Sequence, residues 1–184
     1  MVSRNPLGRL LGLSIALGSL ALAAPLPASA AAAASHSLPA FTCASKSGGQ
    51  QTARGTVYSI RAAHHPGYDR LVFGFPTTNH LPSYRITMQR SSTFIQDASG
   101  RPVTLEGSAG LKVVFKNADV VRGVPSDLKP RLPEIREVKK IGEFERVVSY
   151  GVGLSRAACY RAFELTGPGG GPTRLVIDVR TRGI

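Results

Sequence analysis

Hydrophobic and polar residues alternate along much of the chain after residue 55. The clearest case is YRITMQ at 84–89, where Tyr84, Ile86 and Met88 fall on one side. A period of two places successive side chains on opposite faces of a strand, so it predicts half-buried antiparallel strands. The same period recurs in segments 56–63, 70–75, 111–117 and 174–180; in the first of these, Tyr58 is expected on the same side as Ile60 and Ala62.

Three further segments complete the pattern. Residues 145–154 are apolar on both sides, which is typical of a central strand. Residues 159–166 are expected to pair with 174–179 through the GPGGGP loop, and 134–140 fits either a short helix or a strand. Proline and glycine interrupt the pattern at strand-like intervals. The predicted fold is all-β: an antiparallel β-sandwich of roughly eight strands, with a barrel as the alternative.

The motif Arg-Leu-Val occurs twice, in GYDRLVFGF at 67–75 and in TRLVIDV at 173–179. Both copies begin with an arginine and place their large apolar side chains on one side. We interpret them as two strands with equivalent roles in one sandwich. Asp69 and Arg70 are then expected to order the start of a strand through a surface ion pair of little energy, which is a structural role.

Residues 1–30 have the features of a secretory signal peptide. Arg4 and Arg9 precede an apolar run at 10–24, which is too short to span a bilayer comfortably, and Ala-Ser-Ala at 28–30 supplies small residues for cleavage. The alternative is a retained N-terminal anchor. We expect cleavage, which leaves a secreted chain without a transmembrane segment.

The remaining chain divides into two parts. Residues 31–55 are mostly small and polar, and predict a flexible tether, because such a segment buries too little apolar surface to become ordered. Residues 56–184 form the single expected domain. Cys43 and Cys159 are the only cysteines. They form either a disulfide or two free thiols, and export favours the disulfide.

Charge suggests the class of partner. Loss of residues 1–30 removes two arginines and lowers the formal charge from +12 to +10. Such a basic secreted chain attracts anionic wall polymers and glycans, although high charge also serves solubility alone. If the basic side chains converge, they form a cationic face, for which the candidate ligand-binding residues are Arg85, Lys112, Lys116, Arg136, Lys139 and Lys140.

No catalytic or metal-binding motif is evident. His64 and His65 are adjacent, so in a strand they point to opposite faces and cannot bind one metal ion. We therefore expect no catalytic residue, no metal and no cofactor. Sparse aromatic residues and export also argue against nucleic acid as a partner. Tyr84 and Tyr150 are candidates to stack on sugars, but their alternation favours the core.

Several segments, in this order, resemble the AMIN-like domain proteins, which are secreted bacterial proteins. They are GYDRLVFGF, YRITM, DASGRPVTLEGSAGLKVVF, IGEFERVVSYGVGL, YRAFEL and TRLVIDV, and they cover roughly residues 56–181. The residues of these motifs to which we assign a structural role are Tyr68, Asp69, Arg70, Arg174 and Asp178.

This resemblance implies a β-sandwich that acts as a noncatalytic targeting module for the cell envelope. The expected partner is peptidoglycan, another wall glycan or an anionic envelope polymer, and the expected location is extracytoplasmic, either secreted or associated with the cell wall. The alternative is a structural domain that engages an envelope protein through a sheet edge or the tether. An enzyme is the third hypothesis, because fold alone does not decide function.

Overall fold

The computed structural model describes residues 37–76, 80–97, 99–167 and 171–182. The expected signal peptide lies outside these residues. The described segments consist of strands and connecting loops, without a helix, so none of them is a helix long and apolar enough to cross a membrane. The all-β prediction is confirmed.

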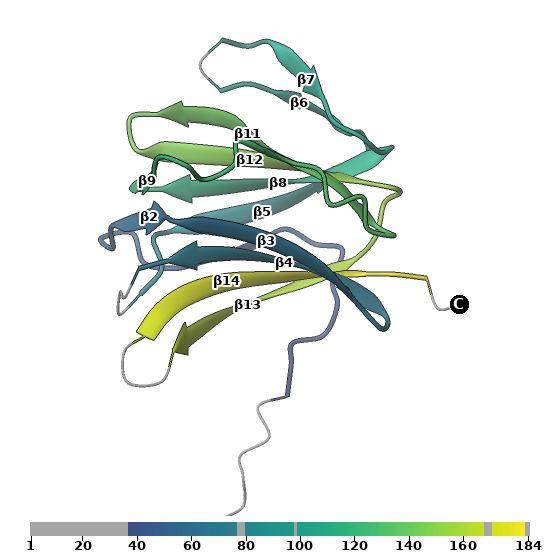
Figure 1. Ribbon diagram of the computed structural model, residues 1–184, viewed down its shortest axis with the longest axis horizontal. Coiled ribbons are helices and arrows are strands. Elements are labelled where there is room, and N and C mark those ends of the chain that lie inside the picture. Colours follow the sequence, from purple (N-terminus) through teal and green to yellow (C-terminus); the bar gives the residue numbers. More distant parts are fainter. Residues whose placement is uncertain (1–36, 77–79, 98, 168–170, 183–184) are drawn as a thin grey trace, which may run out of the picture. The chain divides into compact units, whose positions relative to one another are not determined.

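Two antiparallel sheets make up most of the described chain (Figure 1). The six-stranded sheet contains, in spatial order, β1 (Lys46–Gly48), β5 (Tyr84–Gln89), β8 (Ala109–Lys116), β12 (Val147–Leu154), β11 (Ile135–Phe144) and β10 (Asp127–Leu128). The four-stranded sheet contains β13 (Tyr160–Gly167), β14 (Gly171–Arg180), β4 (Tyr68–Phe75) and β3 (Ser59–His65). Two short pairs are added, the parallel β2 (Gly55–Val57) and β9 (Ala118–Val120) and the antiparallel β6 (Thr93–Ile95) and β7 (Pro102–Thr104).

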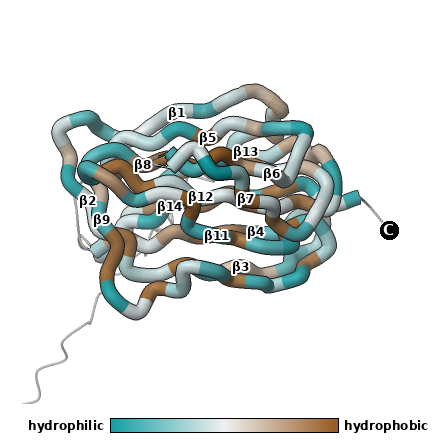
Figure 2. Tube along the Cα trace, turned by 90° about the horizontal axis from the view of Figure 1, so that it is seen from above, coloured by the Kyte–Doolittle hydropathy of each residue, from teal (hydrophilic) through white to brown (hydrophobic). Residues whose placement is uncertain are grey.

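The main core lies between the two sheets. Phe73 of β4 packs against Phe115 of β8 and Tyr150 of β12, with ring centroids 5.2 and 5.1 Å apart. All three side chains are buried. Edge-to-face and tilted ring pairs of this kind stabilise a core beyond the burial of their area. Tyr84 and Tyr150 are therefore core residues, as their alternation predicted. Figure 2 shows the alternation of hydrophobic and hydrophilic segments along the strands.

The β6–β7 hairpin covers the outer face of the six-stranded sheet, beside β11 and β12 in Figure 1. Its Phe94 packs with Leu105 and Ile141 in a second, smaller core. A Cβ atom on Gly151 of β12 would come within 2.9 Å of the Phe94 ring, so glycine is needed for this close approach. This cover explains why residues 145–154 are apolar on both sides: β12 is central and is buried on both faces.

The two Arg-Leu-Val motifs form neighbouring strands. β4 and β14 pair in antiparallel register, so that Leu175 lies opposite Phe73 and Ile177 lies opposite Leu71. All four side chains face the core. The repeated motif therefore reflects two adjacent strands with the same inward and outward alternation, as expected. β14 also pairs with β13 across the GPGGGP segment, as predicted.

The prediction of a flexible tether is wrong for the described residues 37–55. Cys43 is joined to Cys159 by a disulfide, Thr42 pairs with Tyr160, and residues 46–48 form edge strand β1 beside β5. Composition alone failed here because the segment buries little of its own surface. Cross-links to the sandwich supply the order instead.

Candidate functional site

An arginine–aspartate–arginine row crosses the outer face of the four-stranded sheet. Asp178 of β14 lies between Arg161 of β13 and Arg70 of β4. Arg70 donates two hydrogen bonds to the Asp178 carboxylate, from Nε at 2.7 Å and from Nη2 at 2.9 Å, and Arg161 Nε donates a third at 2.8 Å. The Asp178 side chain is fully buried beneath these two arginines. Its hydrogen bonds are the main reason that the pKa of Arg70 is raised.

Aromatic rings hold these arginines in place. The guanidinium groups of Arg70 and Arg161 each lie 5.1 Å from the centre of the Tyr68 ring. Phe41, from the disulfide-linked N-terminal segment, lies 4.7 Å from Arg161 and 4.9 Å from Arg180. Cation–π contacts of this kind fix the planar guanidinium groups while leaving part of each exposed. The cluster is therefore ordered in advance of any ligand.

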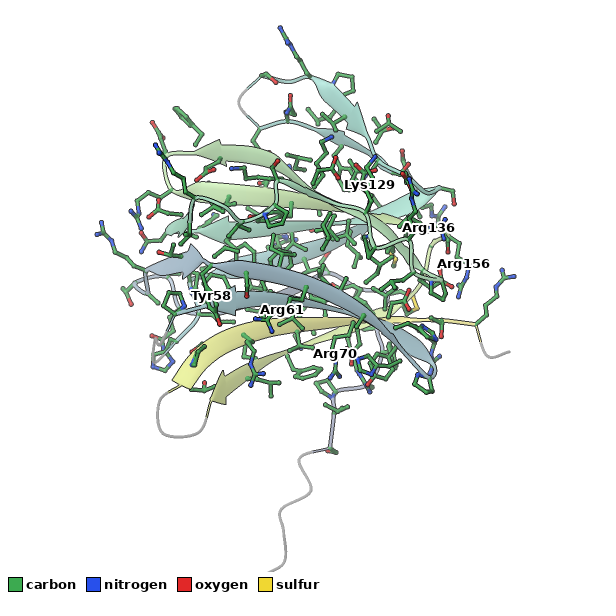
Figure 3. The ribbon with its side chains drawn as sticks, viewed as in Figure 1. Tyr58, Arg61, Arg70, Lys129, Arg136 and Arg156 are labelled. Atoms are coloured by element: carbon green, nitrogen blue, oxygen red, sulfur yellow. A yellow bond between two sulfur atoms is a disulfide. The ribbon has the colours of Figure 1, made fainter. Side chains whose placement is uncertain are left out.

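Arginine dominates this whole outer face. By the strand register, the outward positions of the described parts of β3, β4, β13 and β14 carry a single carboxylate, that of Asp178. They carry five arginines. We call this surface the arginine face, defined by Arg61, Arg70, Arg161, Arg174 and Arg180. Figure 3 shows Arg61 and Arg70 spaced along it.

A pocket of about 440 Å³ lies at one end of the arginine face. Arg61 of β3 and Arg174 of β14 line it, together with Tyr58. Among the described residues, neither arginine has a carboxylate or hydrogen-bond partner. Tyr58 is 37% exposed and lies next to Arg61 along the sheet (Figure 3). Guanidinium groups without a counter-charge are suited to carboxylate or phosphate groups.

Asp69 has a different role from the surface ion pair that we expected. It does not pair with Arg70 but points to the interior, where its Oδ2 accepts hydrogen bonds from the backbone N–H groups of Glu134 and Ile135 at 2.6 and 3.0 Å. Its Oδ1 lies 2.7 Å from Nδ1 of His64. The carboxylate is fully buried and ties β4 of one sheet to the start of β11 in the other. Adjacent residues on a strand point to opposite faces, which is why the side chains of Asp69 and Arg70 lie on opposite sides of the sheet.

The other motif residues also lie in the four-stranded sheet. The Tyr68 ring stacks on the His65 ring, with their centroids 5.0 Å apart, and also contacts the arginines described above. Arg174 faces outward and lines the pocket, opposite Gly74. All of the motif residues except Asp69 thus lie on the outer side of this sheet, with the arginine face.

The basic residues expected to bind ligand lie elsewhere, in the six-stranded sheet. Register places Lys112 and Lys139 in one row on either side of Gly151, and Arg85 lies nearby on β5. Lys112 pairs with Asp97 at 2.6 Å and Lys139 with Asp127 at 3.2 Å.

The remaining members of this set differ in their surroundings. Lys140 pairs with Glu143, and Arg136 donates to the carbonyl of Leu132 at 3.1 Å. Lys116 is exposed at the end of β8. Figure 3 shows Arg136 near Lys129 and Arg156, away from Tyr58. Half of the predicted set is thus locally neutralised by carboxylates.

A second pocket, of about 260 Å³, has acidic walls. It is lined by Asp97, Glu143 and Glu145 together with Phe144, which is 61% exposed. Burial alone would raise the pKa of Asp97, but hydrogen bonds from Lys112 and Ser149 lower it. Within the described residues, no group of three or more potential ligands could bind a metal ion.

Sequence analysis missed Tyr58, Arg61, Arg161 and Arg180. It placed Tyr58 on the inner side with Ile60, but Val57 and Ile60 are both buried although they are three residues apart. The strand is interrupted between β2 and β3, so Tyr58 faces outward. The arginines were visible as outward positions of predicted strands. A search for charge along neighbouring strands, rather than along the sequence, would have found them.

Comparison with known protein families identifies a family. The profile of the AMIN-like domain family matches residues 55–181, which covers both sheets apart from β1. The search of curated proteins finds no match.

Proposed function

This chain belongs to the AMIN-like domain family, and from that premise we propose that it is a noncatalytic module that binds an anionic polymer of the bacterial cell envelope. The family points to the envelope. The observation that carries the proposal is the excess of five arginines over one carboxylate on the arginine face. Peptidoglycan and anionic wall polymers offer the carboxylate or phosphate groups that such a face attracts.

The charge of this face remains available for a ligand. Asp178 neutralises only part of the Arg70 and Arg161 pair. Arg61, Arg174 and Arg180 have no carboxylate partner among the described residues. Guanidinium groups bind carboxylates and phosphates in a planar, bidentate way, which favours binding over mere solubility. We therefore place the binding surface here rather than on the lysines of the six-stranded sheet.

The proposed location is extracytoplasmic. The predicted signal peptide at 1–30 would export the chain, and the Cys43–Cys159 disulfide is stable in an oxidising compartment. Both features agree with the family. A domain that binds an envelope protein is the alternative function, and it predicts no direct affinity for the polymer.

Sedimentation with purified peptidoglycan sacculi tests the proposal. The protein should pellet at low salt and be released as salt rises, because exposed charges are screened. The triple variant Arg61→Gln, Arg174→Gln and Arg180→Gln should lose most of this binding.

A matched control carries Lys112→Gln, Lys139→Gln and Lys140→Gln, whose charges are already paired. It should pellet like the unaltered protein. Absence of pelleting at low salt would contradict the proposal, and so would loss of binding in the lysine variant alone. Binding to an extracted envelope protein in place of sacculi would support the alternative.

A further inference from the structure

The pocket at the end of the arginine face has features of a site for one defined chemical unit. We propose that it binds a single sugar unit that bears a carboxylate, with the sugar ring against Tyr58 and the carboxylate between Arg61 and Arg174. This inference rests on the proposed function and specifies the ligand at one part of the same surface. A flat charged patch would select charge alone, whereas a pocket also selects shape.

The strand register builds the floor of the pocket. Arg61 lies opposite Val72, and Arg174 lies opposite Gly74, so only a small apolar strip of β4 separates the two arginines. A Cβ atom on Gly74 would come within 2.3 Å of Ser59 Oγ and 3.1 Å of the Tyr58 ring. A side chain at position 74 would therefore collide with Ser59 and press on the Tyr58 ring. The glycine lets this ring lie close against β4 at the edge of the pocket.

Tyr58 forms one wall and is held from both sides. Its N–H donates to the carbonyl of Gly74 at 3.0 Å, and the preceding Val57 is fully buried in the main core. The ring is thus fixed at its base but remains 37% exposed. A rigid aromatic ring offers contact area at a low cost in conformational entropy. It suits the carbon face of a sugar ring.

Charge selects an acidic ligand. Among the described residues, two guanidinium groups and no carboxylate line the pocket. Its volume of about 440 Å³ lies within the range of small-molecule sites. A free phosphate would use the arginines but not the Tyr58 ring or the apolar floor of Val72. A carboxylated sugar uses all of these groups, and this is why we favour it.

Backbone amide NMR of the purified protein, with Gly74, Gly167 and Gly171 as reporters, tests the inference. The probes are glucuronate, N-acetylmuramate, glucose, N-acetylglucosamine and inorganic phosphate. The acidic sugars should shift the reporters saturably and the neutral sugars should not. A preference for N-acetylmuramate indicates wall glycan as the source, and a preference for glucuronate indicates another acidic glycan.

Three single variants and one control define the site. Arg61→Gln and Arg174→Gln should each weaken binding by about tenfold, because each removes a charge-assisted hydrogen bond to the carboxylate. Tyr58→Ala should also weaken binding, because it removes the ring that contacts the sugar. The control Lys139→Gln lies on the other sheet, where Lys139 pairs with Asp127, and it should leave the affinity unchanged. Equal shifts with neutral sugars, or with phosphate alone, would overturn the inference. Pelleting with sacculi but no sugar binding in the pocket would reject this inference and leave the proposed function intact; loss of both would reject both.

Discussion

At the scale of single residues, the buried carboxylate of Asp69 links the two sheets. The backbone N–H groups of Glu134 and Ile135, at the start of β11, both donate to it in the interior. Asp69→Ala should lower the free energy of unfolding by about 3 kcal/mol, because it leaves both donors unsatisfied in the interior. Urea denaturation measures this change.

His64 provides the matched control for this prediction. It contacts the same carboxylate but is 45% exposed. His64→Ala should therefore cost less than about 1 kcal/mol. Equal losses in the two variants would show that the backbone hydrogen bonds to Asp69 contribute little.

At the scale of elements, the β11–β12 hairpin has a two-residue turn built from unfavourable residues. Glu145 and Arg146 both adopt positive φ angles, of 47° and 62°. Such turns normally carry asparagine and glycine, because other side chains are strained in this region. Glu145→Asn should raise the free energy of unfolding by about 0.5 to 1 kcal/mol in urea denaturation.

Arg146→Gly serves as the comparison. It relieves the same backbone strain, but it removes the contacts of Arg146 with Asn117 at 3.0 Å and with Asp119 at 2.8 Å. It should give no gain. A loss of stability in Glu145→Asn would mean that the turn is not strained as its φ angles indicate.

Elements also show what the sequence could and could not predict. Most of the eight strands of six or more residues were predictable from their alternation, whereas β12 was recognised by its apolar run and β11 was left open between a helix and a strand. β1 and β10 were not, since three and two residues carry no period. The candidate site depends on strand order and register. Arg61 and Arg174 are far apart in the chain, and they line one pocket because β3 and β14 flank the same strand, β4. The alternation pattern assigned Tyr58 to the wrong face, because the strand is interrupted between β2 and β3.

At the scale of the whole molecule, tyrosines in the core link stability to pH. Burial is the main cause that raises the pKa of Tyr84 and of Tyr150. Below a pH of about 10, both tyrosines are protonated in the folded and unfolded states, so their burial contributes fully to the free energy of unfolding. Above it, only the unfolded chain ionises, and stability falls as pH rises.

Tyrosinate absorbance and circular dichroism, followed together during alkaline titration, check this prediction. Ionisation of the buried tyrosines should coincide with unfolding. Tyr150→Phe removes a buried hydroxyl that has no hydrogen-bond partner among the described residues, so it should preserve stability near neutral pH and reduce the alkaline loss. Tyrosinate from the core that forms while the sheets remain folded would contradict it.

The disulfide-linked N-terminal segment determines where this molecule can safely be shortened. The family match begins at residue 55. However, β1 pairs with the outer edge of β5, and Cys43 is bonded to Cys159. A fragment that begins at residue 55 would expose the unpaired backbone N–H and C=O groups of the β5 edge, and strands of other chains could pair with them. It would also carry an unmatched sulfhydryl. Aggregation and covalent dimers would follow from a cut that removes no part of the matched family region.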